Sequence, residues 1–369
     1  MSELDYSRLI SILNNPKDVG YPVVLPDFFV DHFVTFKSLD KLIDGLKGLA
    51  EQGGGNLLEN EQFIRRGGNA VNTASALQTL GLKPKLIVTT DVHGVSLLKA
   101  LANPELDLNH VHVDGRLSST VSIETEYRGR KVNLMVSDSG SAKEFSFSEL
   151  TDHDINAIRG CSLIALVNLN HNLKGSELAH DLFQMVRETS NAVTFMDIGD
   201  PSGNPKLVGK LIKRVVSQGL VDVFGLNENE VRWVAQNLSN DSKRWQDIQS
   251  KPLDWLKAAQ FVSRETGVRI DLHTPYFAAT IHKDETTTVP SFDVESRVVC
   301  GAGDAWNAGN IYGTLLDLLP EDQLILANAV ASLYVSSSAA SHPTLTEIVK
   351  FLERKPMLSG DGTKLLKSE

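Results

Sequence analysis

The chain has 369 residues, of which 41% are hydrophobic and 22% are charged, and its formal net charge is −10. This composition is typical of a folded globular protein and excludes a disordered one. The length allows one large domain or two ordinary ones. Since the chain is acidic and has no block of basic residues, nucleic acid is not expected as a partner.

The N-terminal stretch MSELDYSRLISILNNPKD has acidic residues early and no basic segment before an apolar run, so we expect no signal peptide. No stretch reaches about 18 consecutive apolar residues, and therefore no membrane span is expected. The two cysteines, Cys161 and Cys300, are too few for a disulfide framework, and we expect both to be reduced and buried. Together these features predict a cytoplasmic protein.

In chain order, short apolar segments alternate with longer segments of helical periodicity, and several of the apolar segments resemble strands that are covered on both faces. Strands are expected at 22–30, 85–90, 162–169, 192–198, 221–226 and 269–274. Helices are expected at 69–81, 176–188, 205–219 and 254–267, and then at 304–318, 321–337 and 344–353. The alternation predicts an α/β fold, with a doubly wound, mostly parallel sheet and helices on both faces.

Two segments depart from this alternation. Residues 118–137 show two alternating strands around Arg128-Gly129-Arg130, which predicts a hairpin with one polar face. The hairpin fits an ordinary sheet edge or a mobile flap over a site. Residues 236–252 are polar, and we expect them to form an exposed insertion.

Acidic residues lie at the end of the first predicted strand, in PDFFVDHF at 26–33, and polar residues start the first long helix, in GGNAVN at 67–72. Asp27 and Asp31 fit solvated acids at a strand end or acceptors for sugar hydroxyls. Gly68 fits a plain turn or a close approach of a ligand to the backbone. Asn72 carries an amide that can both donate to and accept from hydroxyls.

The segment GLNENE, at 225–230, directly follows the strand predicted at 221–226. Asn227 and Glu230 are three residues apart and share a face if a helix starts here. One interpretation is a capped helix start, where acidic residues are favoured by the helix dipole. The other is that Glu230 orders a hydrated Mg²⁺ ion near phosphates.

The segment VVCGAGDAWNAGN, at 298–310, places two glycines and an aspartate before a predicted helix. The backbone N–H groups of Gly301, Ala302 and Gly303 would point at the helix start, where an anion is stabilised. Asp304 at the same point could take the proton of an attacking hydroxyl. An anion pocket beside a carboxylate base is suited to phosphoryl transfer to an alcohol, although a glycine-rich turn alone also explains the segment.

The order of these segments resembles the ribokinase-like (PfkB) family of sugar and nucleoside kinases over most of the chain. GAGD with a trailing glycine is the family's most specific motif, and GLNENE is a second one. The resemblance implies a single ribokinase-like kinase domain over 1–369, with a small β-sheet lid that includes 118–137. It leaves open a homodimer formed through the lid.

The resemblance also implies roles for individual residues. Asp304 would be the catalytic base, and Gly301, Ala302 and Gly303 would form the anion hole. Asp31, Gly68 and Asn72 match the acceptor-binding positions. Asn227, His273 and Thr274 would contact the nucleotide, and Glu230 would organise Mg²⁺ through water. The expected partners are therefore a sugar or nucleoside and a nucleotide, with ATP as donor.

Two departures from the family's pattern affect these expectations. Val298-Val299-Cys300 stands where the family often has an acid that helps to form a monovalent-cation site, so we expect no ordinary potassium requirement. At 272–277 the chain reads LHTPYF in place of a glycine-containing nucleotide loop, and its His-Thr pair is similar to ADP-dependent archaeal sugar kinases. ADP therefore remains an alternative donor.

Three alternatives to a sugar kinase remain at this stage. A nucleoside kinase of the same family fits the motifs equally well. A non-catalytic sugar or nucleoside sensor on the same fold would be favoured by loss of Asp304 or Glu230, but both are present. A dinucleotide oxidoreductase is disfavoured, because its glycine fingerprint should follow the first strand of a βαβ unit.

Overall fold

The computed structural model describes residues 4–248 and 251–367, and its centre is an eight-stranded sheet in the order β14-β13-β12-β11-β10-β9-β1-β4. The six strands from β4 to β12 are parallel, β13 pairs antiparallel with β12, and β14 pairs antiparallel with β13. The strands are β1 (Pro22–Leu25), β4 (Lys85–Leu86), β9 (Leu163–Leu166), β10 (Val193–Asp197), β11 (Val223–Asn227), β12 (Arg269–His273), β13 (Phe277–His282) and β14 (Glu285–Pro290).

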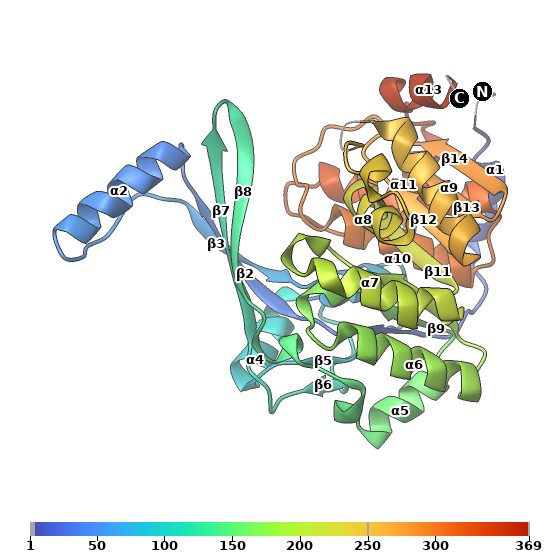
Figure 1. The fold of residues 1–369 in the computed structure, drawn as a ribbon. Coiled ribbons are helices and arrows are strands. Elements are labelled where there is room, and N and C mark those ends of the chain that lie inside the picture. The colour runs from blue at the N-terminus through green and yellow to red at the C-terminus, as the bar shows by residue number, and fades with distance from the viewer. Residues whose placement is uncertain (1–3, 249–250, 368–369) are drawn as a thin grey trace.

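Helices cover both faces of this sheet, as Figure 1 shows. Consecutive strand residues pack into different cores, since Val24 joins one apolar cluster and Val23 joins the other. The first cluster includes α1 (Ser7–Asn14), α3 (Asn69–Thr79), α4 (Val92–Leu101), α10 (Ala302–Leu315), α11 (Pro320–Ser336) and α12 (Leu345–Glu353). The second includes α5 (Asp152–Arg159), α6 (Gly175–Thr189), α7 (Pro205–Arg214), α8 (Glu228–Leu238) and α9 (Pro252–Thr266). The predicted doubly wound α/β fold is therefore confirmed.

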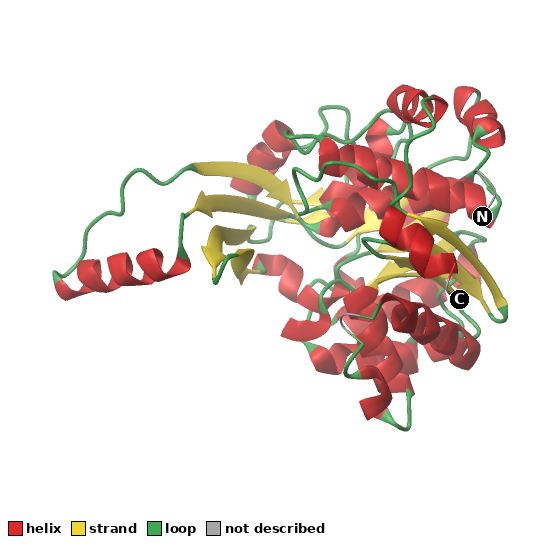
Figure 2. Cartoon of the chain, turned by 90° about the horizontal axis from the view of Figure 1, so that it is seen from above, coloured by secondary structure: helices red, strands yellow, loops and turns green. Residues whose placement is uncertain are grey.

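A second, four-stranded sheet, called the small sheet below, has the order β3-β2-β7-β8. It consists of β2 (Phe29–Thr35), β3 (Gln62–Gly67), β7 (Ser118–Tyr127) and β8 (Arg130–Asp138). The predicted hairpin is confirmed, with Arg128 and Gly129 in the left-handed region at the turn. Figures 1 and 2 show that the small sheet and α2 (Leu39–Glu51) project away from the layered body.

Two of the predicted strands are each divided between two sheets. The strand expected at 22–30 ends at Leu25, and β2 begins at Phe29 in the small sheet. Pro26 lies between them and has no N–H to continue a ladder. The strand expected at 85–90 divides into β4 and β5 (Val88–Thr89), and β5 pairs with β6 (Val111–His112) in a separate two-stranded sheet.

The prediction that 236–252 is an exposed insertion is wrong at its apolar residues. Trp245 and Ile248 are buried in the core formed by the helices on the α9 face. The Trp255 indole N–H donates to the Ile248 carbonyl at 2.6 Å, which fixes the segment to α9. The burial of two large side chains explains why a polar segment stays folded against the body. Residues 249–250 lie outside the described part of the chain.

The C-terminal residues form α13 (Gly360–Lys367) beside β14. Among the described residues, no helix combines the length and the apolar character that a membrane span needs.

Candidate active site

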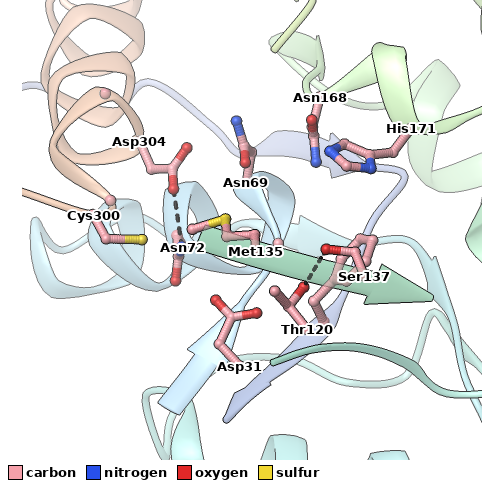
Figure 3. A pocket seen from close by; sticks show the side chains of 14 residues that line it. Asp31, Asn69, Asn72, Thr120, Met135, Ser137, Asn168, His171, Cys300 and Asp304 are labelled. Atoms are coloured by element: carbon pink, nitrogen blue, oxygen red, sulfur yellow. Dashed lines mark hydrogen bonds between the residues drawn. The ribbon is translucent and has the colours of Figure 1, made fainter. Parts of the chain in front are cut away.

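A pocket of about 240 Å³ lies where the small sheet meets the N-termini of α3 and α10 (Figure 3). Its lining includes six of the residues predicted to form the site: Asp31, Gly68, Asn72, Gly301, Gly303 and Asp304. They come from segments that are far apart in the sequence, and the fold brings them together. Ala302, Asn227, Glu230, His273 and Thr274 are not among the lining residues.

Asp304 is the third residue of α10, and its carboxylate is buried at the base of the pocket with 6% of the residue exposed. The Asn72 side-chain amide donates to Asp304 Oδ2 at 2.9 Å. Burial raises the pKa of Asp304 well above its usual value, although the hydrogen bond from Asn72 opposes the shift. A carboxylate with a raised pKa is a better proton acceptor than an exposed one, so the geometry suits general-base chemistry.

The turn before α10 requires glycine at Gly301. This residue has φ of 87°, and a Cβ atom there would lie 2.5 Å from the Tyr334 hydroxyl oxygen. The Tyr334 hydroxyl donates to the Cys300 carbonyl at 2.9 Å, and the Ala302 N–H donates to the Val299 carbonyl at 3.1 Å. The Ala302 N–H is thus used within the turn.

The expectation that both cysteines are buried is wrong for Cys300. Cys161 is buried, whereas Cys300 is exposed and lines the pocket. Its place in the turn before α10 explains the difference, since this turn runs along the pocket and not through the core. Both cysteines are free.

Asp31 of β2 faces the pocket, together with Thr120 of β7 and Ser137 of β8 (Figure 3). Burial raises the pKa of Asp31 to about 6, and a hydrogen bond with Thr120 acts in the opposite direction. An ionised Asp31 can accept hydrogen bonds from hydroxyl groups of a bound ligand.

Asp27, the other acid of PDFFVDHF, has a structural role in this molecule. It is 1% exposed and accepts hydrogen bonds from the backbone N–H groups of Asn69 and Ala70, at 3.1 and 2.9 Å. The Asn168 amide also donates to it at 2.8 Å. These bonds satisfy the free N–H groups at the start of α3, so Asp27 positions the helix that carries Asn72.

Asn227 and Glu230 form the capping box of α8. The Asn227 side-chain oxygen accepts from the Glu230 N–H, and both Glu230 carboxylate oxygens accept from Asn227, each at 2.9 Å. Burial, with a further contribution from nearby Asp197, raises the pKa of Glu230 well above its usual value. This geometry matches the capped helix start.

The fit of this end of the sheet to Mg²⁺ depends on its acidic oxygens. Asp197, Asp200 and Glu228 all interact electrostatically with Glu230. Within the described residues, however, no group of three or more His, Cys, Asp or Glu side chains is arranged to hold a metal ion. Mg²⁺ beside phosphates usually keeps several water ligands, so any contact of these residues with the ion would be through water.

His273 and Thr274 lie at the end of β12 and do not line the pocket. His273 stacks on Trp306 with 4.8 Å between ring centroids, and a Cβ atom on Gly303 would lie 3.4 Å from His273 Nε2. Burial lowers the pKa of His273 to about 4, so its ring is neutral. The Thr274 hydroxyl accepts from the Phe277 N–H at 3.0 Å and donates to the Phe277 carbonyl at 2.7 Å, which uses it in a turn.

Several of the residues that line the pocket were not predicted from the sequence. Asn168 and His171 follow β9 and face the pocket beside Phe29, and Met135 of β8 faces it from the small sheet (Figure 3). The signal for Asn168 and His171 was present, because Asn-Leu-Asn-His comes directly after a buried parallel strand, where ligand sites form. Met135 lies on the polar face of a hairpin and gave no such signal.

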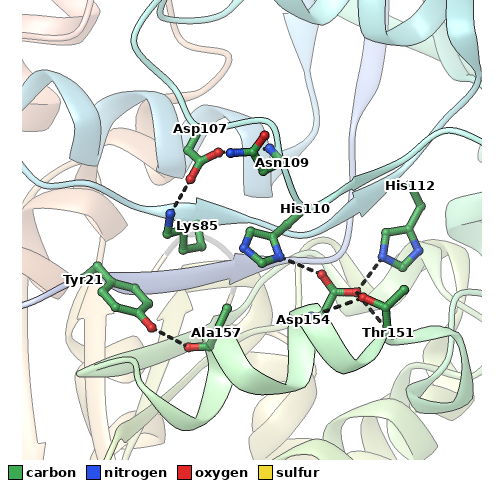
Figure 4. Close-up of polar contacts among 9 residues, drawn as sticks. All are labelled: Tyr21, Lys85, Asp107, Asn109, His110, His112, Thr151, Asp154 and Ala157. Carbon is green, nitrogen blue, oxygen red and sulfur yellow. Dashed lines mark hydrogen bonds and ion pairs between the residues drawn. The ribbon is translucent and has the colours of Figure 1, made fainter.

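A polar cluster outside the pocket holds the connection between the body and β7 (Figure 4). His110 Nδ1 and His112 Nε2 each lie 2.8 Å from a different oxygen of Asp154, and the Thr151 hydroxyl donates to the same carboxylate. The hydrogen bond with Asp154 raises the pKa of His112. Because one ring nitrogen of each histidine is bonded to Asp154, the cluster has a structural role and joins β6 to α5.

Comparisons with known proteins agree with this geometry. The model of the family described as "pfkB family carbohydrate kinase" matches residues 46–347. Among solved structures, Arabidopsis thaliana ribokinase complexed with ribose and ATP has 16% identity and a TM-score of 0.67, covering 90% of this chain and 98% of its own.

Two further structures are similar. Adenosine kinase from Sinorhizobium meliloti has 14% identity and a TM-score of 0.66, covering 90% of this chain and 98% of its own. Burkholderia thailandensis nucleoside kinase, in complex with inosine, has 17% identity and a TM-score of 0.62, covering 91% and 98%. At these identities the structures show the same fold. No curated protein matched the chain.

Proposed function

The chain belongs to the pfkB family of carbohydrate kinases, which are phosphotransferases that act on a hydroxyl group, and we propose that it transfers the terminal phosphoryl group of ATP to a hydroxyl of a sugar. The observation that carries this proposal is the pocket in which Asn72 holds the buried carboxylate of Asp304. In this proposal the whole chain is one kinase domain, and the small sheet closes over the acceptor as a lid.

The acceptor would lie between the small sheet and α3. Asp31 and Asn72 offer a carboxylate and an amide to neighbouring hydroxyl groups, and Gly68 lets the ligand approach the backbone. With φ of 89° and a Cβ position 2.9 Å from the Asp27 carbonyl oxygen, Gly68 has no room for a side chain. Glycine is therefore required for the turn that brings the backbone at the start of α3 to the pocket wall.

Asp304 would take the proton of the attacking hydroxyl as the new oxygen–phosphorus bond forms. The N–H groups of Gly301 and Gly303 lie at the helix start, where the dipole favours the charge that develops on the transferred group. Ala302 would act in the anion hole mainly by shaping the turn, because its N–H already donates to Val299.

The nucleotide would bind on the far side of this turn, near Asn227 and His273. ATP is proposed as the donor because the solved ribokinase of Arabidopsis thaliana contains it, and ADP remains the alternative because of His273 and Thr274. Glu230 would help to hold hydrated Mg²⁺, which neutralises the charge of the phosphates when bound. The side chains themselves supply the base and the orientation of the two substrates.

A nucleoside is the second candidate acceptor, and similar structures include an adenosine kinase and a nucleoside kinase with inosine. A non-catalytic sensor is the third candidate, although it gives no role to a buried base beside an open pocket. A coupled phosphorylation screen of sugars and nucleosides, run with ATP and with ADP, separates these candidates.

The decisive variant is Asp304→Asn, which keeps the shape of the side chain but cannot accept the hydroxyl proton. We expect turnover to fall by about 10²- to 10⁴-fold while acceptor binding, measured by calorimetry, changes little. Turnover within a few-fold of the wild-type value would show that Asp304 is not the base.

A further inference from the structure

A second pocket, of about 190 Å³, shares Asn72 with the acceptor pocket as a lining residue. It opens between β3 and the C-terminal end of α11, and no role assigned above uses it. Its polar lining comes from Arg65, Arg66, Asn72 and Tyr334, and Ala339 and Ala340 complete one wall.

Arg66 has a guanidinium group that is only partly satisfied. Its Nη1 donates to the Leu101 carbonyl at 3.2 Å, but its Nε is buried and has no hydrogen-bond partner among the described residues. Burial lowers the pKa of Arg66, which reports the cost of holding this cation away from water. Arg66 is only partly buried and interacts electrostatically with Asp304, but its buried Nε–H lacks an acceptor, and a bound anion would supply one.

Arg65 likewise forms no ion pair within the described residues, although Asp31 lies directly opposite in the β2–β3 ladder. Its guanidinium carbon lies 4.6 Å from the Phe63 ring centroid and 5.6 Å from that of Phe33. The two rings stack with 4.8 Å between centroids and hold the guanidinium group in place. Stacking uses the face of the guanidinium group and leaves its N–H edge available.

The absence of acidic partners is a local property, because the chain as a whole has a net charge of −10. Two adjacent arginines thus line one pocket without an ion pair to either within the described residues, although Asp304 interacts electrostatically with Arg66 from a distance. Since guanidinium groups form paired, charge-assisted hydrogen bonds with phosphate and carboxylate, these are the ligands that such a pair recognises best. We propose that this second pocket binds an anionic group, either a phosphate or a carboxylate, through Arg65 and Arg66.

The position of this anion site connects it with the catalytic turn. Asn72 lines both pockets and donates to Asp304, and Tyr334 lines the second pocket and donates to the Cys300 carbonyl. A bound anion would therefore contact residues that hold the base and the turn. The anion has two possible sources: a free ion, or a charged group carried by the acceptor itself.

The first experiment uses inorganic phosphate as the probe, with chloride at matched ionic strength as the reference, and follows thermal unfolding. Ala339 is exposed and lines the pocket, so Ala339→Glu places a carboxylate beside the arginines without disturbing the core. We expect phosphate to raise the melting temperature of the wild type saturably. Ala339→Gln should keep this response, and Ala339→Glu should weaken the apparent phosphate affinity by at least about tenfold.

The site would be refuted by the absence of a saturable response in the wild type, or by an equal response in Ala339→Glu and Ala339→Gln, which would place phosphate elsewhere. Arg65→Gln should also lose the response, whereas Arg130→Gln, at the exposed tip of the hairpin, should not. None of these measurements depends on turnover, so their failure is distinct from failure of the proposed kinase activity.

A kinetic experiment identifies the source of the anion and rests on the proposed function. If the acceptor carries the charge, phosphate will compete with it, and Arg65→Gln will raise KM for acidic acceptors but not for neutral ones. If a free anion binds, phosphate will change kcat without competing with the acceptor. Both results support the site, and identical kinetics of wild type and Arg65→Gln at every phosphate concentration contradict it.

Discussion

At the scale of single residues, the two carboxylates that face the acceptor pocket differ in how deeply they are buried. The Asp304 side chain is almost inaccessible to solvent, and its pKa is raised far above the usual value. Asp31 is only partly buried, and its pKa is raised to about 6. Burial disfavours the ionised form in both cases. The more exposed group therefore ionises at a lower pH, which suits a residue that accepts hydrogen bonds from hydroxyl groups.

This difference predicts how acceptor use depends on pH. Because the pKa of Asp31 is raised to about 6, its ionised fraction falls as the pH drops through that value, and kcat/KM for the acceptor should fall with it. In Asp31→Asn we expect a lower kcat/KM and a shallower acid limb, because ionisation of Asp304, whose pKa is also raised, still contributes to the limb. Rates measured between about pH 5 and about pH 8 test this prediction. A limb that is unchanged in the variant would assign it to another group.

Glu230 is used in a capping box, so its proposed effect on Mg²⁺ must be separated from its effect on the helix. Glu230→Gln should raise the Mg²⁺ concentration needed for half-maximal activity more than it changes the KM for the acceptor. Glu347→Gln is a matched control, because Glu347 completes the same kind of capping box with Thr344 at the start of α12. Equal Mg²⁺ titrations of wild type and Glu230→Gln would leave Glu230 with its capping role alone.

At the scale of elements, the turn before α10 is held by hydrogen bonds within the protein. The Cys300 carbonyl accepts from the Tyr334 hydroxyl, and the Val335 carbonyl accepts from the N–H groups of Arg297 and Val298, at 2.8 and 3.1 Å. These carbonyls are therefore already satisfied without an ion. Val298 itself offers no oxygen ligand in its side chain, and hard cations need several.

This arrangement predicts that a monovalent cation is not required. Activity should be nearly the same in sodium, potassium and tetramethylammonium salts at matched ionic strength, which removes the effect of screening on nucleotide binding. The measurement is the initial rate across a titration of each salt. A several-fold, saturable activation by potassium would show that the turn can still bind a cation.

The elements also show how far sequence patterns reach. Strands β10 to β12 were predicted to within two residues and β9 to within three, because each is a short apolar run with turn residues at its ends. The division of 22–30 and 85–90 between sheets could not be predicted, since the partner of a strand is set by residues far away in the chain. The second pocket could not be predicted for the same reason, because Arg65 and Arg66 are far from Tyr334 in the sequence and only the fold brings them together.

The candidate site was predictable in part for the same physical reason. Asp304, Asn72 and Asp31 lie in local motifs, and the structure brings all three to one pocket. His273 and Thr274 were also predicted from a local pattern, but the fold places them outside that pocket, with Thr274 used in a turn. A motif therefore located the residues that start a helix or end a strand, but not the side chains that complete the cavity.

At the scale of the whole molecule, the small sheet has one face directed at the pocket and another directed away from it. Asp31, Thr120 and Ser137 share the pocket face. The register places Ile64, His32, Val121 and Val136 in one row on the opposite face, and its three apolar residues are 50%, 41% and 67% exposed. Exposed apolar side chains that share one face of a projecting sheet are typical of a surface that another chain covers.

We therefore predict that two copies of the chain associate through this face of the small sheet, forming a homodimer. Val136→Glu would place a charge in this row, and burying it without a partner would cost several kcal/mol, enough to favour the monomer. Sedimentation at a range of protein concentrations measures the change. Leu319→Glu, which alters an apolar residue on the body that is 56% exposed, is the control and should leave the dimer intact. A wild-type chain that sediments as a monomer at all concentrations would contradict the prediction, and the exposed row would then need another partner.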